Sequence, residues 1–76
     1  MENMTEILWS LAGTLRLTDA GKNIVSIVPL TVPVYGTVYV RDIARITYQS
    51  GRTKDIGIDC DSGIAAIYDV VRDLCF

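Results

Sequence analysis

The segment from residue 61 to residue 75 constrains the fold most, because its apolar side chains recur with helical periodicity. Asp61 or Ser62 can cap this helix, which we expect to run to about Leu74. At 100° per residue, one arc of roughly 160° holds Ile64, Ile67, Tyr68, Val70, Val71, Leu74 and Cys75. The opposite side holds Ala65, Ala66, Asp69, Arg72 and Asp73. The pattern predicts a helix that packs on a sheet, with Ile67 and Val71 near the centre of the buried face.

A first strand is predicted over residues 9–18, where apolar and polar side chains alternate. The apolar phase consists of Trp9, Leu11, Gly13, Leu15 and Leu17, with Gly13 expected at a bulge or against a close neighbour. The alternative is a short helix over residues 4–12, because Ile7, Leu8, Leu11 and Leu15 also have helical spacing. The alternation covers more residues, and it therefore favours the strand.

The next segments predict two hairpins. A turn over residues 18–23 leads into the β-branched run 24–28, which should return antiparallel to the first strand. Pro29 and Pro33 cannot donate to a sheet, so residues 29–36 should form an edge strand or a surface loop. Residues 41–59 predict a second hairpin with Gly51 at its tip, and a single helical turn over 40–44 is the alternative there.

Together these elements predict one α+β domain that covers residues 1–76. Its expected architecture is a small antiparallel sheet of four or five strands in two hairpins, with one C-terminal amphipathic helix on one face. A domain of this size buries a modest fraction of its surface.

The two cysteines predict packing rather than chemistry. Cys60 and Cys75 lie on either side of the predicted helix, and fifteen helical residues rise about 22 Å. A disulfide needs Cα atoms within about 7 Å. We therefore expect reduced thiols, with Cys75 in the core and at most an N-terminal helix dipole to activate Cys60.

Catalytic and cofactor sites are not expected. The chain has no histidine, the commonest general base, and its serines and threonines show no arrangement typical of a nucleophile. Lys22 and Lys54 are expected in or beside solvated turns, which do not activate a lysine. Two distant cysteines do not complete a structural zinc site. We therefore expect a protein that is not an enzyme and holds neither a metal nor another cofactor.

The excess of apolar residues predicts an interaction surface. Half of the residues are apolar and only 21% are charged, which is more apolar surface than a small monomer can bury. Residues 28–40 carry no charge, and we expect a homodimer or another protein to cover them, with the interface at Val34, Tyr35, Val38 and Tyr39. The predicted function is a non-enzymatic protein–protein interaction or accessory module.

The predictions of cellular location and of an alternative function are based on the charged and aromatic residues. The net charge is −2, the five arginines are scattered, and residues 1–6 do not begin a signal peptide, so we expect a cytoplasmic protein without membrane contact. The alternative is a small nucleotide- or nucleic-acid-binding protein that uses these arginines and a stacking platform. That platform would consist of Trp9, Tyr35, Tyr39 and Tyr48.

Overall fold

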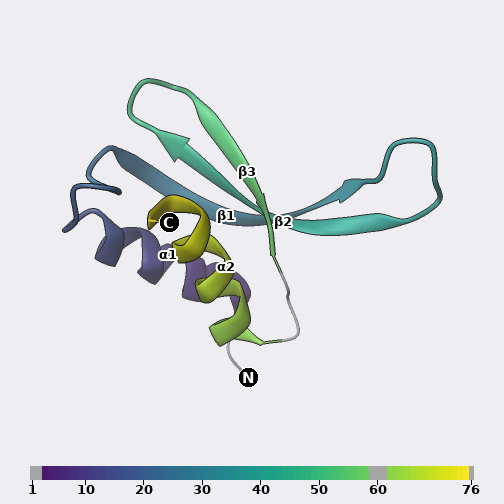
Figure 1. Cartoon of the computed structure of the whole chain (residues 1–76), viewed down its shortest axis with the longest axis horizontal. Helices are drawn as coiled ribbons and strands as arrows, with labels where there is room; N and C mark the ends of the chain where they lie inside the picture. The colour runs from purple at the N-terminus through teal and green to yellow at the C-terminus, as the bar shows by residue number, and fades with distance from the viewer. Residues whose placement is uncertain (1–2, 59–61, 76) are drawn as a thin grey trace.

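The computed structural model describes residues 3–58 and 62–75. The elements run in the order α1 (Met4–Leu15), β1 (Ile24–Pro33), β2 (Val40–Tyr48), β3 (Thr53–Gly57) and α2 (Gly63–Cys75) (Figure 1). The fold is α+β, as predicted, but the antiparallel sheet has three strands in the order β1-β2-β3, fewer than the four or five expected. The strand predicted over residues 9–18 is absent, because residues 9–15 belong to α1, a second helix. The first predicted hairpin, between residues 9–18 and 24–28, is therefore not formed.

The prediction of a strand at residues 9–18 was wrong, and the helical alternative was closer. The side chain of Asn3 accepts a hydrogen bond from the N–H of Thr5 at 2.9 Å and caps α1. The buried residues of α1 have i, i+3, i+4 and i+7 spacing: Leu8, Leu11, Ala12 and Leu15. Trp9 and Leu17, which supported the alternation, are 70% and 88% exposed. The period of two was therefore fortuitous.

β1 is an edge strand that contains both prolines, and it pairs with β2 from Ile24 opposite Tyr48 to Pro33 opposite Val40. The register shifts once, between Ile24 and Ser26, which places a bulge at the start of β1. Arg16, the C-cap of α1, donates two hydrogen bonds there: Nε to the carbonyl of Ile24 at 2.9 Å and an Nη to the carbonyl of Val25 at 2.7 Å. This contact joins the end of α1 to the beginning of β1.

The second hairpin was predicted correctly. β2 pairs with β3 between Ile43–Gly57 and Thr47–Thr53, and the turn contains Gly51 at a φ of +86°. Residues 40–44 are extended, so the helical turn considered for them is not formed. Lys54 lies in β3 beside this turn and is exposed, as expected.

α2 begins where the sequence predicted, but its buried face is rotated from the predicted one. The hydroxyl of Ser62 accepts from the N–H of Ala65 at 3.1 Å, which is the capping bond. Ala66, assigned to the polar side, is fully buried together with Val70. Ile64 and Tyr68 are 82% and 62% exposed, and Ile67 and Val71 are half-buried. The centre of the buried face therefore lies near Val70.

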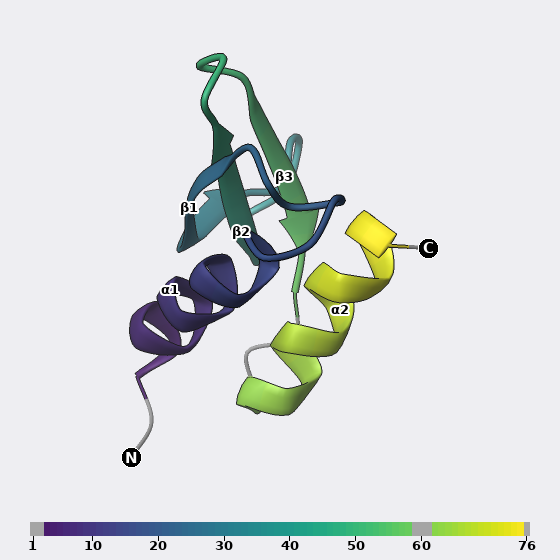
Figure 2. The same ribbon diagram turned by 90° about the vertical axis from the view of Figure 1, so that its left-hand side faces the viewer.

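Both helices cover the same face of the sheet (Figure 2). One core cluster joins α1, the sheet and α2: Leu8, Leu11, Ala12, Leu15, Ile24, Ile27, Ala44, Ile46, Ile56 and Val70. Alternate residues of β2 point to the other face, which no described helix covers and which we call the open face. Ile43 lies on the open face, yet it is only 3% exposed. Its cross-strand neighbours there are Leu30 and Gly57.

Candidate interaction surface

The hairpin of β1 and β2 extends beyond the rest of the sheet. β3 pairs with β2 only as far as Ile43, so residues 31–42 have no third strand beside them. We call residues 31–42 the hairpin arm. Figure 1 shows the arm projecting away from both helices. Every residue from 33 to 42 is exposed, because the arm extends past both helices. Only the base of the arm reaches the end of β3, where Arg41 lies against Gly57 and the carbonyl of Asp42 accepts from the N–H of Ile58 at 3.1 Å.

The four residues predicted as an interface all lie in the hairpin arm. Val34 is 36% exposed, Tyr39 73%, Val38 94% and Tyr35 102%, and Val40 beside them is 64% exposed. Exposed apolar side chains gathered in one place are typical of a protein–protein contact. The structure therefore brings these four side chains together at the tip of one projection.

Internal hydrogen bonds fix the tip of the arm. The N–H of Val34 donates to the carbonyl of Tyr39 at 3.0 Å, and the N–H of Thr37 donates to the carbonyl of Val34 at 3.1 Å. The hydroxyl of Thr37 donates to the Val34 carbonyl at 2.9 Å and accepts from the N–H of Tyr39 at 3.1 Å. Gly36 has a φ of +78°, which suits glycine. The exposed side chains are thus presented by an ordered turn, which lowers the entropy lost on binding.

The aromatic residues do not form the stacking platform considered above. Tyr39 directly precedes β2 and Tyr48 is its last residue, so the two lie roughly 30 Å apart along an extended strand. Trp9 lies on the exposed side of α1, at the other side of the molecule from the hairpin arm. The arginines are also dispersed, with Arg16 at the end of α1 and Arg72 over the ring of Tyr68 at 5.4 Å from its centroid.

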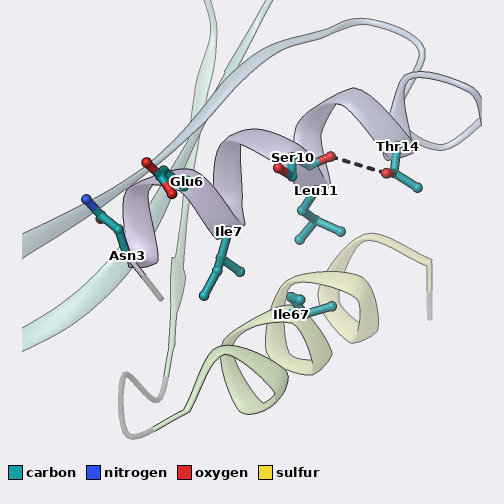
Figure 3. Close-up of a pocket in the computed structure, with 7 residues that line it drawn as sticks. All are labelled: Asn3, Glu6, Ile7, Ser10, Leu11, Thr14 and Ile67. Carbon is teal, nitrogen blue, oxygen red and sulfur yellow. Dashed lines mark hydrogen bonds between the residues drawn. The ribbon is translucent and has the colours of Figure 1, made fainter. Parts of the chain in front are cut away.

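An open groove of about 440 Å³ runs along α1 on the side of α2 (Figure 3). Its lining residues are Asn3, Glu6, Ile7, Ser10, Leu11, Thr14 and Ile67. Ile7, Leu11 and Ile67 point into the space between the helices, whereas the polar side chains lie along its margin. Glu6 is the one ionisable side chain in this lining, so the groove lacks an acid–base pair. Sequence patterns do not predict this groove, because the alternation over residues 9–18 favours a strand where α1 lies.

A second hollow, of about 560 Å³, lies beside the β2–β3 turn. Asn23, Tyr48, Gln49, Ser50 and Arg52 line it. The N–H of Gln49 donates to the carbonyl of Asn23 at 2.9 Å, which ties this turn to the start of β1. The hollow contains one cation and no carboxylate, so it also lacks an acid–base pair.

The ion pairs of the described residues lie at the surface. Arg45 and Asp55, directly opposite each other on β2 and β3, form two hydrogen bonds of 2.8 and 3.0 Å on the open face. These hydrogen bonds from Arg45 lower the pKa of the Asp55 carboxyl. Lys54 on β3 pairs with Asp73 on α2, and the hydrogen bond to Asp73 raises the pKa of Lys54. Both shifts are accounted for by these pairs and need no ligand.

The remaining site predictions concern metals, membranes and thiols. Among residues 3–58 and 62–75, no group of three His, Cys, Asp or Glu side chains is placed to hold a metal ion. No helix in the described part of the chain has the length and apolar character needed to cross a membrane. The predictions for Cys60 and for the side chain of Cys75 lie outside the described residues.

Comparison with known proteins adds no relative. No protein-family model matches the sequence, and no curated protein or solved structure matches it.

Proposed function

We propose that the chain is a non-enzymatic, cytoplasmic protein–protein interaction module that forms a homodimer through the hairpin arm. Val34, Tyr35, Val38 and Tyr39 form the contact in this proposal. A symmetric two-fold contact is the commonest way in which a protein covers such a surface with a second copy.

One observation carries the proposal: the most exposed apolar side chains at the tip belong to an ordered, projecting turn. Tyr35 and Val38 are almost completely exposed although both are large and apolar. A domain with a surplus of apolar residues could bury these side chains against its own helices, yet the arm projects away from them. Covering them by a second copy would remove apolar surface from water, which favours association.

The prolines indicate how the two copies meet. The N–H of Val34 donates to the carbonyl of Tyr39, so the backbone groups of Val34 point toward β2. Successive residues of β1 point their backbone groups to opposite edges, so the odd-numbered Pro29 and Pro33 face the outer edge of the sheet. These positions lack an N–H, which disfavours the addition of a strand along this edge. The proposed contact is therefore made by side chains of the arm and not by a continuous sheet through β1.

Sedimentation velocity at micromolar protein tests the proposal. We expect a dimer for the native chain and a monomer for Tyr39→Asp, because an unpaired carboxylate in the contact costs free energy. Tyr68→Asp is the matched control, since Tyr68 on α2 is 62% exposed and Tyr39 is 73% exposed. It should leave the dimer intact. A monomeric native chain would refute the homodimer, and a Tyr39→Asp dimer would refute the assignment to the arm.

A further inference from the structure

The two outer edges of the sheet differ in their capacity to accept another strand. In an antiparallel sheet, the backbone groups of successive residues point to opposite edges. The N–H of Ile58 donates to the carbonyl of Asp42 at 3.1 Å, and the carbonyl of Arg52 accepts from the N–H of Tyr48 at 2.9 Å. The even-numbered residues of this segment therefore face β2. The backbone groups of Thr53, Asp55 and Gly57 face outward.

The outer edge of β3 is free among the described residues. Thr53, Asp55 and Gly57 are exposed, and their backbone N–H and C=O groups make no hydrogen bond within the described part of the chain. They repeat at every second residue, which is the spacing that an incoming strand requires. No proline interrupts β3, whose sequence is TKDIG.

The outer edge of β1, in contrast, is blocked at several points. Pro29 and Pro33 occupy outward positions and offer no N–H. At the start of the strand, Arg16 already occupies the carbonyls of Ile24 and Val25. The chain therefore protects one edge with prolines and an arginine and leaves the other edge open.

A cation lies beside the open edge. The guanidinium of Arg41 crosses the open face to Gly57, where it fills the space that a Cβ atom would occupy. Arg41 is exposed and has no carboxylate partner among the described residues, whereas the neighbouring Arg45 is paired with Asp55. Its guanidinium can therefore bind a carboxylate on a strand placed next to Gly57.

We propose that the outer edge of β3 binds an extended polypeptide segment of a partner protein that carries an acidic side chain opposite Gly57. Backbone hydrogen bonds to Thr53, Asp55 and Gly57 extend the sheet by one strand, and Arg41 selects the acidic residue. Of the residues proposed here, only Arg41 belongs to the hairpin arm, at its base. None of the four contact residues of the proposed homodimer takes part, so the inference does not depend on that dimer.

The probes are two seven-residue peptides of alternating threonine and valine, one with a central glutamate and one with a central lysine. NMR titration at roughly millimolar peptide should move the amide signals of Thr53, Asp55 and Gly57. The glutamate peptide should bind about two- to fivefold more tightly, the range of an exposed ion pair. Arg41→Gln should abolish this preference while leaving the binding of the lysine peptide unchanged.

Two proline variants locate the site. Thr53→Pro removes one outward N–H from β3 and should weaken binding of both peptides. Thr31→Pro removes an outward N–H from β1 and should not affect binding. Absence of shifts at the β3 amides, or loss of binding in Thr31→Pro alone, would overturn the proposal. Shifts of the Thr53, Asp55 and Gly57 amides that grow with protein concentration in the absence of peptide would also overturn it, because a second copy would then occupy this edge. Concentration-dependent shifts confined to residues 34–39 belong to the proposed dimer.

Discussion

Lys54 on β3 and Asp73 in the last turn of α2 form an ion pair, with Nζ 2.7 Å from Oδ2. Both side chains are a little under half exposed. The pair joins two elements that are distant in sequence, and Asp73 follows the buried Val70 by three residues in α2. It therefore couples the position of α2 to the sheet through charge as well as through packing.

Replacing Asp73 by Asn should lower the free energy of unfolding by up to about 1 kcal/mol, the range for a solvent-exposed pair. The pair raises the pKa of Lys54, so its contribution is present below pH 10.5 and is lost as the pH rises through the higher folded-state pKa. Urea unfolding at pH 7 and at pH 11.5 measures the contribution of the ion pair to the free energy of unfolding. The difference between the native chain and Asp73→Asn should shrink at the higher pH. An equal difference at both values would show that Asn disturbs the helix and not the ion pair.

Asp55 should make the protein sensitive to acid. Hydrogen bonds from Arg45 lower the pKa of Asp55 below its ordinary value of 3.8. A lowered folded-state pKa stabilises the fold above pH 3.8, and this contribution is lost as the pH falls through the folded-state value. Unfolding free energies of the native chain and Asp55→Asn, measured from pH 6 to pH 2, should therefore converge at the acid end. Parallel curves would contradict the pairing of Asp55 with Arg45.

Replacement of Gly13 and of Gly21 by alanine should change the free energy of unfolding in opposite directions. Gly13 lies inside α1, and a Cβ atom there meets nothing within 4 Å. Gly13→Ala should therefore raise the free energy of unfolding by about 0.5–1 kcal/mol through helix propensity. At Gly21 a Cβ atom would lie 2.5 Å from the carbonyl oxygen of Leu15, so Gly21→Ala should destabilise. Thermal melts of the two variants test the pair. Destabilisation by Gly13→Ala would contradict the helix at this position.

Sequence patterns predicted the elements that local signals define. The β2–β3 hairpin follows from its alternation and from Gly51, which needs a positive φ, and the start of α2 follows from the cap at Ser62. The exposed position of Tyr35 and Val38 follows from an uncharged segment that contains two prolines. In each case the residues that carry the signal lie within a few positions of the element.

The predictions that failed depend on tertiary packing and strand register. In residues 9–18, Leu11 and Leu15 fit the strand period of two as well as the helical period. Only the packing of α1 on the sheet shows that Leu8 and Ala12 are buried and Trp9 is exposed. Arg41 and its position over Gly57 depend on β2–β3 register, which the residues of one strand do not specify. Association remains a prediction, because it concerns a second molecule.

The rotated face of α2 gives the last prediction, for which Val70 and Val71 form a matched pair. The sequence placed Val71 near the centre of the buried face, whereas the structure buries Val70 completely and leaves Val71 half-buried. Val70→Ala removes two buried carbon groups and leaves a cavity, so the free energy of unfolding should fall by roughly 2–3 kcal/mol. Val71→Ala should cost about half as much, because part of its surface already contacts water. Helix propensity favours alanine equally at both positions, so it cancels in the comparison. Chemical unfolding of the two variants decides between the faces, and a larger loss for Val71→Ala would restore the face predicted from the sequence.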